Sequence, residues 1–277
     1  MAGSDPLRVG GAPEGYDAFL IADWARDAGG PLLHIARDDR RAAAMADALA
    51  FVAGDLPVLR FPAWDCTPYD RVSPNAEVSA QRMATLAALA DGFDRPAVIL
   101  ATANAVTLRT PLRAVVGAGS FTAAVGERVD LEALTAFLAR SGFNRATSVM
   151  EPGDFALRGG IVDIFPPGAE TPVRLDFFGD VLDGARRFEV ESQRTVERIE
   201  RVELAPASEA PLDPEAISRF RAGYRETFGA AGLDDPLYEA VSAGRKHQGM
   251  EHWAPLFHDG METLFDYLKD APVTPDH

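Results

Sequence analysis

The spacing of apolar residues changes character close to Pro111, and this change limits the possible folds more than any single motif does. Before it, short β-like runs alternate with Ala-rich amphipathic segments of helix length. The runs are PLLHIA (31–36), LPVLRF (56–61) and AVILATA (97–103). Such alternation is typical of βαβ units. We therefore predict an α/β fold in which helices, one capped by Asp38 and the next opened by Asn75 or Pro74, cover a parallel sheet.

After Pro111 the runs become shorter, and glycine or proline interrupts them. A short helix is predicted over 130–140 with Asp130 as its N-cap, and an antiparallel β-meander over 154–204, in which TVERIERVEL (195–204) is the last run. In PVRLDFF the alternation predicts two opposite faces, with Val173, Leu175 and Phe177 on one and Arg174, Asp176 and Phe178 on the other. The second set includes an exposed aromatic candidate.

Downstream of Pro206 the pattern becomes helical again, with Asp213 as the expected N-cap of the first helix. The chain ends just after a last predicted helix and shows no run that would form a closing strand, so we expect a piece of a longer protein. The predicted organisation is a first α/β piece over 1–115, an inserted β-rich domain over 116–206 and a second α/β piece over 207–277.

The charge balance argues against a protein that binds polyanions by itself. The 27 Lys and Arg residues face 42 Asp and Glu residues, a formal net charge of -15, which repels phosphate backbones and anionic lipids. The single Cys66 excludes an internal disulfide and a multi-Cys zinc site, and we expect a buried, inert thiol. The five histidines are too far apart to predict a metal site. Without a signal peptide or a long apolar run, the sequence indicates a cytoplasmic protein with no membrane partner.

A glycine-containing segment, GGAPEGYDAFLIADWA (10–25), stands where a phosphate-binding loop would precede a helix. Such a loop needs a Lys for the terminal phosphates and a Ser or Thr hydroxyl for magnesium. Counting from Gly11, the Lys position holds Asp17, which would repel phosphate, and the hydroxyl position holds Ala18. We therefore interpret the segment as a turn that leads into a helix. Since no other catalytic motif occurs, we predict that the chain is not an enzyme.

Two stretches, FPAWDCTPYDRVSPNAEVSAQRMATL (61–86) and PGDFALRGGIVDIFPPGAETPVRLDFFGDVLDGARRFEVESQRTVERI (152–199), together resemble the N-terminal module of the bacterial transcription-repair coupling factors. With the closing MEHWAPLFHDGMETLFDYL, the resemblance covers nearly all of residues 7–268. That module is similar in fold to the repair protein UvrB. The resemblance implies a RecA-like parallel-sheet domain with a degenerate P-loop, built from two sequence pieces, into which a small β-rich α+β domain is inserted.

The resemblance also implies an adaptor whose small β domain binds the repair protein UvrA. The positions that match the family's docking residues are Arg158 in ALRGG, Arg174 and Phe178 in VRLDFF, Asp176 on the same strand face, and Arg145 in GFNRAT. An additional arginine of UvrB is matched by Ala156, so the two interfaces cannot be identical.

Other activities of the family are implied to lie outside this chain. The degenerate nucleotide loop (Gly11, Gly15, Asp17 and Ala18) lacks UvrB's Lys and Thr, and segment 61–80 lacks the aromatic hairpin that UvrB inserts into damaged DNA. RNA polymerase and DNA would be bound by C-terminal domains, which also contain the motor that uses ATP and magnesium. One C-terminal domain would cover the docking face in the full-length protein. The chain itself would need no cofactor.

Two other functions remain open from the sequence: a residual nucleotide-binding domain and a DNA-binding module. The docking residues also have simpler interpretations, namely Arg158 and Arg174 as solvated charges of a strand face, Phe178 as packing against the RecA-like half, and Asp176 as the partner of an arginine. Arg145 could likewise have no functional role. If the docking side chains leave the meander on its outward face, their removal should change folding stability by only about 0.5 kcal/mol.

Overall fold

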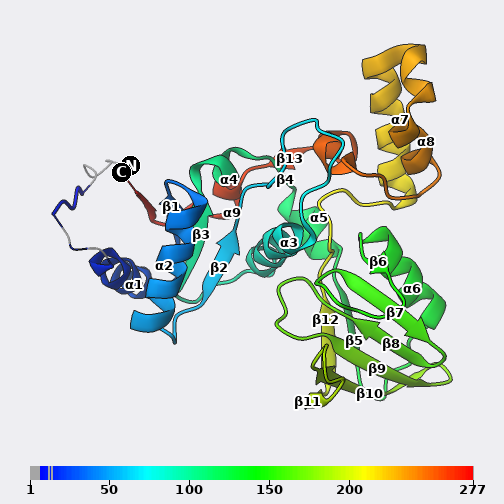
Figure 1. Cartoon of the computed structure of the whole chain (residues 1–277), viewed down its shortest axis with the longest axis horizontal. Helices are drawn as coiled ribbons and strands as arrows, with labels where there is room; N and C mark the ends of the chain where they lie inside the picture. Colours follow the sequence, from blue (N-terminus) through cyan, green and yellow to red (C-terminus); the bar gives the residue numbers. More distant parts are fainter. Residues whose placement is uncertain (1–6, 12, 14, 277) are drawn as a thin grey trace.

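A parallel sheet of four strands forms the centre of the first part of the molecule (Figure 1). The structure, a computed structural model, describes residues 7–11, 13 and 15–276. The sheet has the order β14-β1-β3-β2. Its strands are β1 (Pro31–Ala36), β2 (Val58–Phe61), β3 (Ala97–Thr102) and β14 (Val273–Pro275). Every neighbouring pair runs parallel, so the predicted parallel sheet is confirmed.

Strand β14 shows that the expectation of no closing strand is wrong. It lies beside β1, with Leu33 opposite Val273 and Ile35 opposite Pro275. A three-residue segment that ends in proline gives no strand pattern of its own. The strand exists because the far end of the chain finds a partner in β1, and such a pairing between distant segments is not visible in local periodicity.

Helices cover both faces of this sheet. One face is covered by α1 (Tyr16–Ala28) and α2 (Asp39–Val52). The other is covered by α3 (Ala76–Ala90), α4 (Ala103–Thr107), α5 (Arg113–Ala118) and α9 (Leu264–Tyr267). Along β3, Val98 packs in the first layer and Ile99 in the second, as alternation along a strand requires. Because α9 and β14 come from the end of the chain, both sequence pieces build this sheet and its layers.

The predicted helix N-caps are confirmed. In each case a side-chain oxygen accepts a hydrogen bond from backbone N–H groups of the first turn, which would otherwise lack partners. The residues are Asp38 for α2, Asn75 for α3, Asp130 for α6 (Leu131–Arg140) and Asp213 for α7 (Pro214–Phe228).

A six-stranded sheet forms the inserted part of the chain, with the order β11-β10-β9-β8-β7-β6. Its strands are β6 (Asn144–Arg145), β7 (Asp154–Arg158), β8 (Ile161–Ile164), β9 (Val173–Phe178), β10 (Val181–Phe188) and β11 (Thr195–Ile199). Neighbours are antiparallel except β6 and β7, which run parallel. An α/β fold with an inserted β-rich part is thus confirmed, and the finer RecA-like assignment stays a prediction.

The expected single strand over 195–204 is wrong. The segment divides into β11 and β12 (Arg201–Leu204), and β12 pairs with β5 (Phe121–Ala124) in a separate two-stranded sheet. The reason lies in the core that both sheets share. Ile199 packs against that core from the large sheet, whereas Val202 is buried in it from the small one, so the chain crosses between the two sheets.

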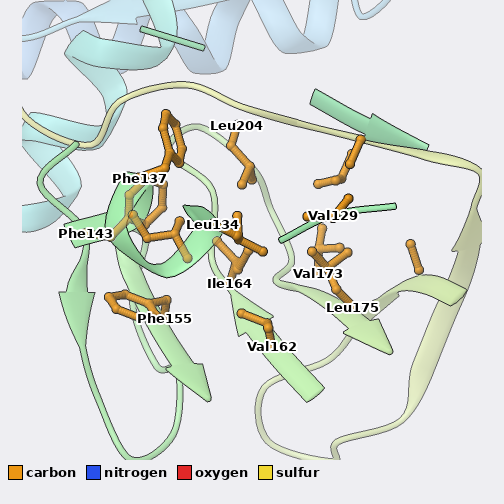
Figure 2. Packing of buried hydrophobic residues seen from close by; sticks show 14 of the residues in the cluster. Val129, Leu134, Phe137, Phe143, Phe155, Val162, Ile164, Val173, Leu175 and Leu204 are labelled. Carbon is orange, nitrogen blue, oxygen red and sulfur yellow. The ribbon is translucent and has the colours of Figure 1, made fainter. Parts of the chain in front are cut away.

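A hydrophobic core joins α6, the small sheet and the inner face of the large sheet (Figure 2). The labelled residues are Val129, Leu134, Phe137, Phe143, Phe155, Val162, Ile164, Val173, Leu175 and Leu204. In β9, Val173 and Leu175 are buried and Phe177 packs partly buried against the cluster, whereas Phe178 is exposed. The predicted alternation along β9 is therefore confirmed, and it leaves one face of the sheet directed away from this core.

The chain after β12 forms a helical extension, visible at the upper right of Figure 1, before it returns to the parallel sheet. Its elements are α7, the 3₁₀ helix η1 (Gly229–Asp234), α8 (Pro236–Ser242) and the 3₁₀ helix η2 (Met250–Leu256). On the way back, β13 (Met261–Glu262) pairs with β4 (Thr110–Pro111), so the segments before and after the inserted part lie side by side.

Two polar contacts, one buried and one exposed, attach the inserted part to its neighbours. Arg82 of α3 is fully buried, and its Nε lies 2.5 Å from Oε1 of Glu209, which follows β12. The same guanidinium donates a hydrogen bond to the carbonyl of Pro62 at 2.9 Å. Beyond α8, the Nζ of Lys246 donates to Oδ1 of Asn144 in β6 at 2.8 Å. Side chains from both α/β pieces therefore position the β-rich part.

Candidate partner-binding surface

The outer face of the six-stranded sheet carries the docking candidates of β9. Arg174 and Asp176 lie on the face opposite to the buried Leu175, and Phe178 lies near the turn to β10 with 82% of its surface exposed. The alternative that Phe178 packs against the RecA-like half is therefore wrong. An exposed phenylalanine beside charged groups is a feature of protein interfaces.

Arg158 and Arg174 converge on the carboxylate of Asp163 in β8. Arg174 donates from Nε to Oδ1 at 2.6 Å and from Nη2 to Oδ2 at 2.9 Å, and Arg158 donates from Nη2 to Oδ2 at 2.5 Å. The carboxylate needs these partners because Asp163 is only 1% exposed. Its hydrogen bond also raises the pKa of Arg174, while partial burial of the guanidinium acts in the opposite direction. The two arginines are thus held together by one buried charge.

The two arginines differ in how much they show to solvent. The side chain of Arg158 is 52% exposed, whereas that of Arg174 is 15% exposed, with its guanidinium carbon 4.3 Å from the ring centre of Phe188. The interpretation of Arg174 as a solvated charge is therefore wrong. The condition under which its removal would barely change folding stability is therefore not met, and we expect Arg174 to stabilise the fold because it neutralises the buried Asp163.

Asp176 forms an ion pair with Arg186 of the neighbouring strand β10, with Nη2 3.4 Å from Oδ1 and a closer contact between Nη1 and Oδ2. The alternative that Asp176 is the partner of an arginine is confirmed. Both side chains remain partly exposed, at 27% and 31% respectively. The pair belongs to the outer face beside Arg174.

Part of the outer face is covered by a small second apolar cluster, formed by Val149, Ala156, Phe165 and Phe188. Loops after β6, β8 and β10 contribute to it, and Arg174 lies at its border through Phe188. The remainder, near the hairpin ends that carry Arg158 and Phe178, stays open. This open region, together with Arg174, Asp176 and Arg186, is called the outer patch below.

Arg145 lies apart from the outer patch. It is exposed in β6, at the edge of the sheet, and pairs with Phe155 of β7. Strands β7 and β8 stand between β6 and β9, so about 14 Å of sheet separates the backbone of Arg145 from that of β9. Docking through Arg145 would require a partner that spans the whole width of these strands.

Sequence reasoning missed Asp163 and Arg186. In IVDIF the alternation puts Asp163 on the face opposite to the buried Val162 and Ile164, which is the only local signal for its position. Its burial and its two arginine partners depend on cross-strand register, with Asp163 opposite Arg174. Arg186 becomes a partner of Asp176 for the same reason, since β10 returns antiparallel to β9.

The glycine-containing segment of residues 10–25 comprises the turn before α1 and the larger part of that helix. Gly11 and Gly15 have positive φ angles of 73° and 85°, and Gly15 is the N-cap of the helix. Ala12 and Glu14 of this segment lie outside the described residues. Asp17 forms an ion pair with Arg41 of α2, and Ala18 is fully buried.

ATP and magnesium do not fit these residues. A carboxylate that is already paired takes the place of the phosphate-binding Lys, and a buried methyl group takes the place of the magnesium-binding hydroxyl. The Nε of Arg41 also lies 3.2 Å from Oδ2 of Asp276, next to β14. The cationic Arg41 near this segment is thus already paired with the carboxylates of Asp17 and Asp276 and not with a phosphate.

Cys66 is only half-buried, so the expectation of a buried thiol is wrong. Its Sγ lies 3.8 Å from Nε2 of His252, and burial, followed by the nearby charge of Asp65, raises the pKa of the thiol. Within the described residues, no three potential ligands gather to hold a metal ion, and none of the helices there has the length and apolarity needed to cross a membrane.

Comparison with known proteins finds matches for the β-rich part and for the chain around it. A family model described as "UvrB interaction domain" matches residues 121–209, which include the whole outer patch. Proteins named transcription-repair-coupling factor match almost the entire chain. The one from Haemophilus influenzae is 32% identical over 274 residues, covering 99% of this chain and 24% of its own length.

Two further relatives with the same name give the same result. The protein from Escherichia coli is 35% identical over 252 residues, which is 91% of this chain and 22% of the relative. The protein from Myxococcus xanthus is 35% identical over 257 residues, which is 88% of this chain and 21% of the relative. The chain therefore spans less than a quarter of the length of these curated relatives.

Proposed function

Since the chain is a relative of the transcription-repair coupling factors and contains a UvrB interaction domain, we propose that it is an adaptor that binds UvrA through the outer patch. In the full-length protein this contact would bring nucleotide excision repair to stalled RNA polymerase. The matched family domain contains Arg158, Arg174, Asp176 and Phe178. The proposal thus combines the match to the family model with a defined surface of the structure.

The observation that carries the proposal is the convergence of Arg158 and Arg174 on the buried Asp163 beside the exposed Phe178. Arginines and aromatic residues dominate the binding energy of protein interfaces. Here Arg158 donates a hydrogen bond to Asp163 from a single nitrogen, and about half of its side chain remains exposed. Its remaining N–H groups can donate to carboxylates of the partner, while Phe178 fills an apolar pocket beside them.

The proposed role requires no catalysis by this chain. The paired Asp17 and the buried Ala18 argue against ATP binding at the segment before α1. In the full-length protein, RNA polymerase, DNA, ATP and magnesium would be bound by other domains, and one C-terminal domain would cover the outer patch until the motor engages. We place this activity in the cytoplasm.

Calorimetric titration of UvrA with the chain and with Phe178→Ala tests the proposal. Because 82% of Phe178 is exposed, its truncation should leave folding intact. A buried interface aromatic is commonly worth about 2 kcal/mol or more, so we expect binding to weaken about 30-fold. Phe51→Ala is a matched control, since Phe51 on α2 is 89% exposed and lies outside the matched domain.

Wild-type affinity of Phe178→Ala for UvrA would contradict the proposal. A parallel titration with UvrB separates the two partners suggested by the family. If the chain binds UvrB and not UvrA, and Phe178→Ala abolishes that binding, the outer patch is still the binding surface but its partner is UvrB.

A further inference from the structure

A row of arginines crosses three adjacent strands on the outer face of the large sheet. Arg174 in β9 lies directly opposite Arg186 in β10, and Arg186 lies directly opposite Arg198 in β11. Arg186 reaches Asp176, which fixes its direction toward the outer face. Because directly opposite residues point to the same side of a sheet, Arg198 shares this face.

This row is unfavourable for the isolated sheet. Side chains directly opposite each other on antiparallel strands have Cβ atoms about 5 Å apart, and like charges in such pairs repel. Asp163 offsets the charge of Arg174, and Asp176 offsets that of Arg186. Among the described residues, no ion pair joins Arg198 to a carboxylate, and the residue is exposed.

The inner face of the same strands shows the opposite arrangement. One position along, Arg187 in β10 faces Glu197 in β11, and their charged groups lie 3.6 Å apart. Opposite charges therefore meet on that face, while like charges meet on the outer face. The repulsion between the arginines of the outer face does not stabilise the fold. In a chain whose net charge is -15, a row of arginines that does not stabilise its own sheet points to a binding role.

The row also continues the outer patch without a gap. β11 is the edge strand of the sheet, and among the residues that the structure describes no further strand pairs with it. Two residues before Arg198, where the register between β10 and β11 shifts, Val196 is 64% exposed and adds apolar area. Exposed arginines with apolar neighbours are suited to a partner surface that carries carboxylates.

We propose that the docking surface extends from β9 across β10 to β11, so that Arg186 and Arg198 contact an acidic surface of UvrA. This inference rests on the proposed function and extends the outer patch, which already includes Arg186, to Arg198 of β11. Carboxylates of the partner would relieve the repulsion in the row. Arg198, at the rim, contributes mainly to the rate of association and to its dependence on salt.

The charge-reversal variant Arg198→Glu tests this extension. Glutamate at 198 would lie opposite Arg186 and replace a like-charge pair by an attractive one. We therefore expect an unchanged or higher melting temperature together with binding to UvrA about 10-fold weaker in 0.05 M salt, chiefly through slower association. In 0.5 M salt the loss should shrink to about two-fold.

Arg201→Glu is the matched control. Arg201 is also exposed, and its replacement by glutamate changes the net charge by the same amount. However, Arg201 belongs to β12 of the small sheet, where its Nε lies 3.0 Å from Oε1 of Glu203. It should alter UvrA binding by less than about two-fold. Arg198→Gln, which removes the charge without reversing it, should weaken binding less than Arg198→Glu and guards against misfolding of the reversal variant.

Equal effects of Arg198→Glu and Arg201→Glu on UvrA binding would overturn the extension. If Phe178→Ala still weakens binding in that case, only the extension fails and the adaptor function stands. If Phe178→Ala also leaves binding unchanged, the proposed function itself fails.

Discussion

Replacing Arg174 by alanine should destabilise the β-rich domain, because it leaves a buried carboxylate with too few partners. In the intact chain Asp163 receives two hydrogen bonds from Arg174, at 2.6 and 2.9 Å, and one from Arg158 at 2.5 Å. Removing one partner of a buried ion pair typically costs about 3–5 kcal/mol. Arg158 remains in this variant and Arg174 is itself 15% exposed, so we expect a loss of about 2–4 kcal/mol in the free energy of unfolding.

Urea-induced unfolding measures this loss. Arg158→Ala is the internal comparison, since this side chain is 52% exposed and supplies one hydrogen bond, and it should cost about 1 kcal/mol or less. The double variant Asp163→Leu, Arg174→Met removes both charges and keeps apolar volume. It should be more stable than Arg174→Ala, because no unpaired charge is left in the interior.

Two results would refute this reasoning. One is a loss below about 0.5 kcal/mol for Arg174→Ala, the size expected of an ordinary surface substitution. The other is a double variant that is as unstable as Arg174→Ala, which would mean that lost packing on Phe188, and not the unpaired Asp163, causes the effect.

Two predictions concern the α/β part. Asp17→Lys with Ala18→Thr should not produce ATP hydrolysis, because hydrolysis in such motors also needs groups from a second domain; turnover above that of a contaminant-free blank would contradict this. His258 is buried and burial lowers its pKa below 6.5, so its neutral form is favoured in the folded state. The contribution of neutral His258 to stability should be complete above pH 6.5 and decline as the pH falls below that value. Urea unfolding measures this: the free energy of unfolding should change less between pH 7.5 and pH 5.5 for His258→Gln than for the parent chain.

Local signals in the sequence predict the elements whose causes are local. A cap such as Asp38 acts within the first turn of its own helix, so a few neighbouring residues are enough to recognise it. The two faces of β9 follow from alternation within six residues, which is why Val173 and Phe178 end on the sides expected of them.

Strand pairing and burial that depend on residues distant in the chain cannot be predicted from such local signals. β14 exists because Val273 meets Leu33 of β1. Likewise, the burial of Asp163 follows from register, since β9 places Arg174 opposite it. The resemblance selected Arg158 and Arg174 as docking candidates, but it did not indicate the carboxylate of Asp163 that joins them.

The buried carboxylate gives the outer patch a property that a set of freely solvated arginines would lack. A free arginine side chain loses about 2 kcal/mol of rotamer entropy when a partner immobilises it. Arg174 is already held by Asp163, the ring of Phe188 and the side-chain oxygen of Gln193 at 2.8 Å, so most of this loss occurs during folding and not during binding. If the outer patch binds a partner as proposed, Asp163 links stability to recognition, because the charge that makes Arg174 stabilising also fixes the position of its guanidinium. Variants at Arg174 alter both properties together, so the exposed Phe178 and Arg198 are the positions at which binding can be measured separately from folding.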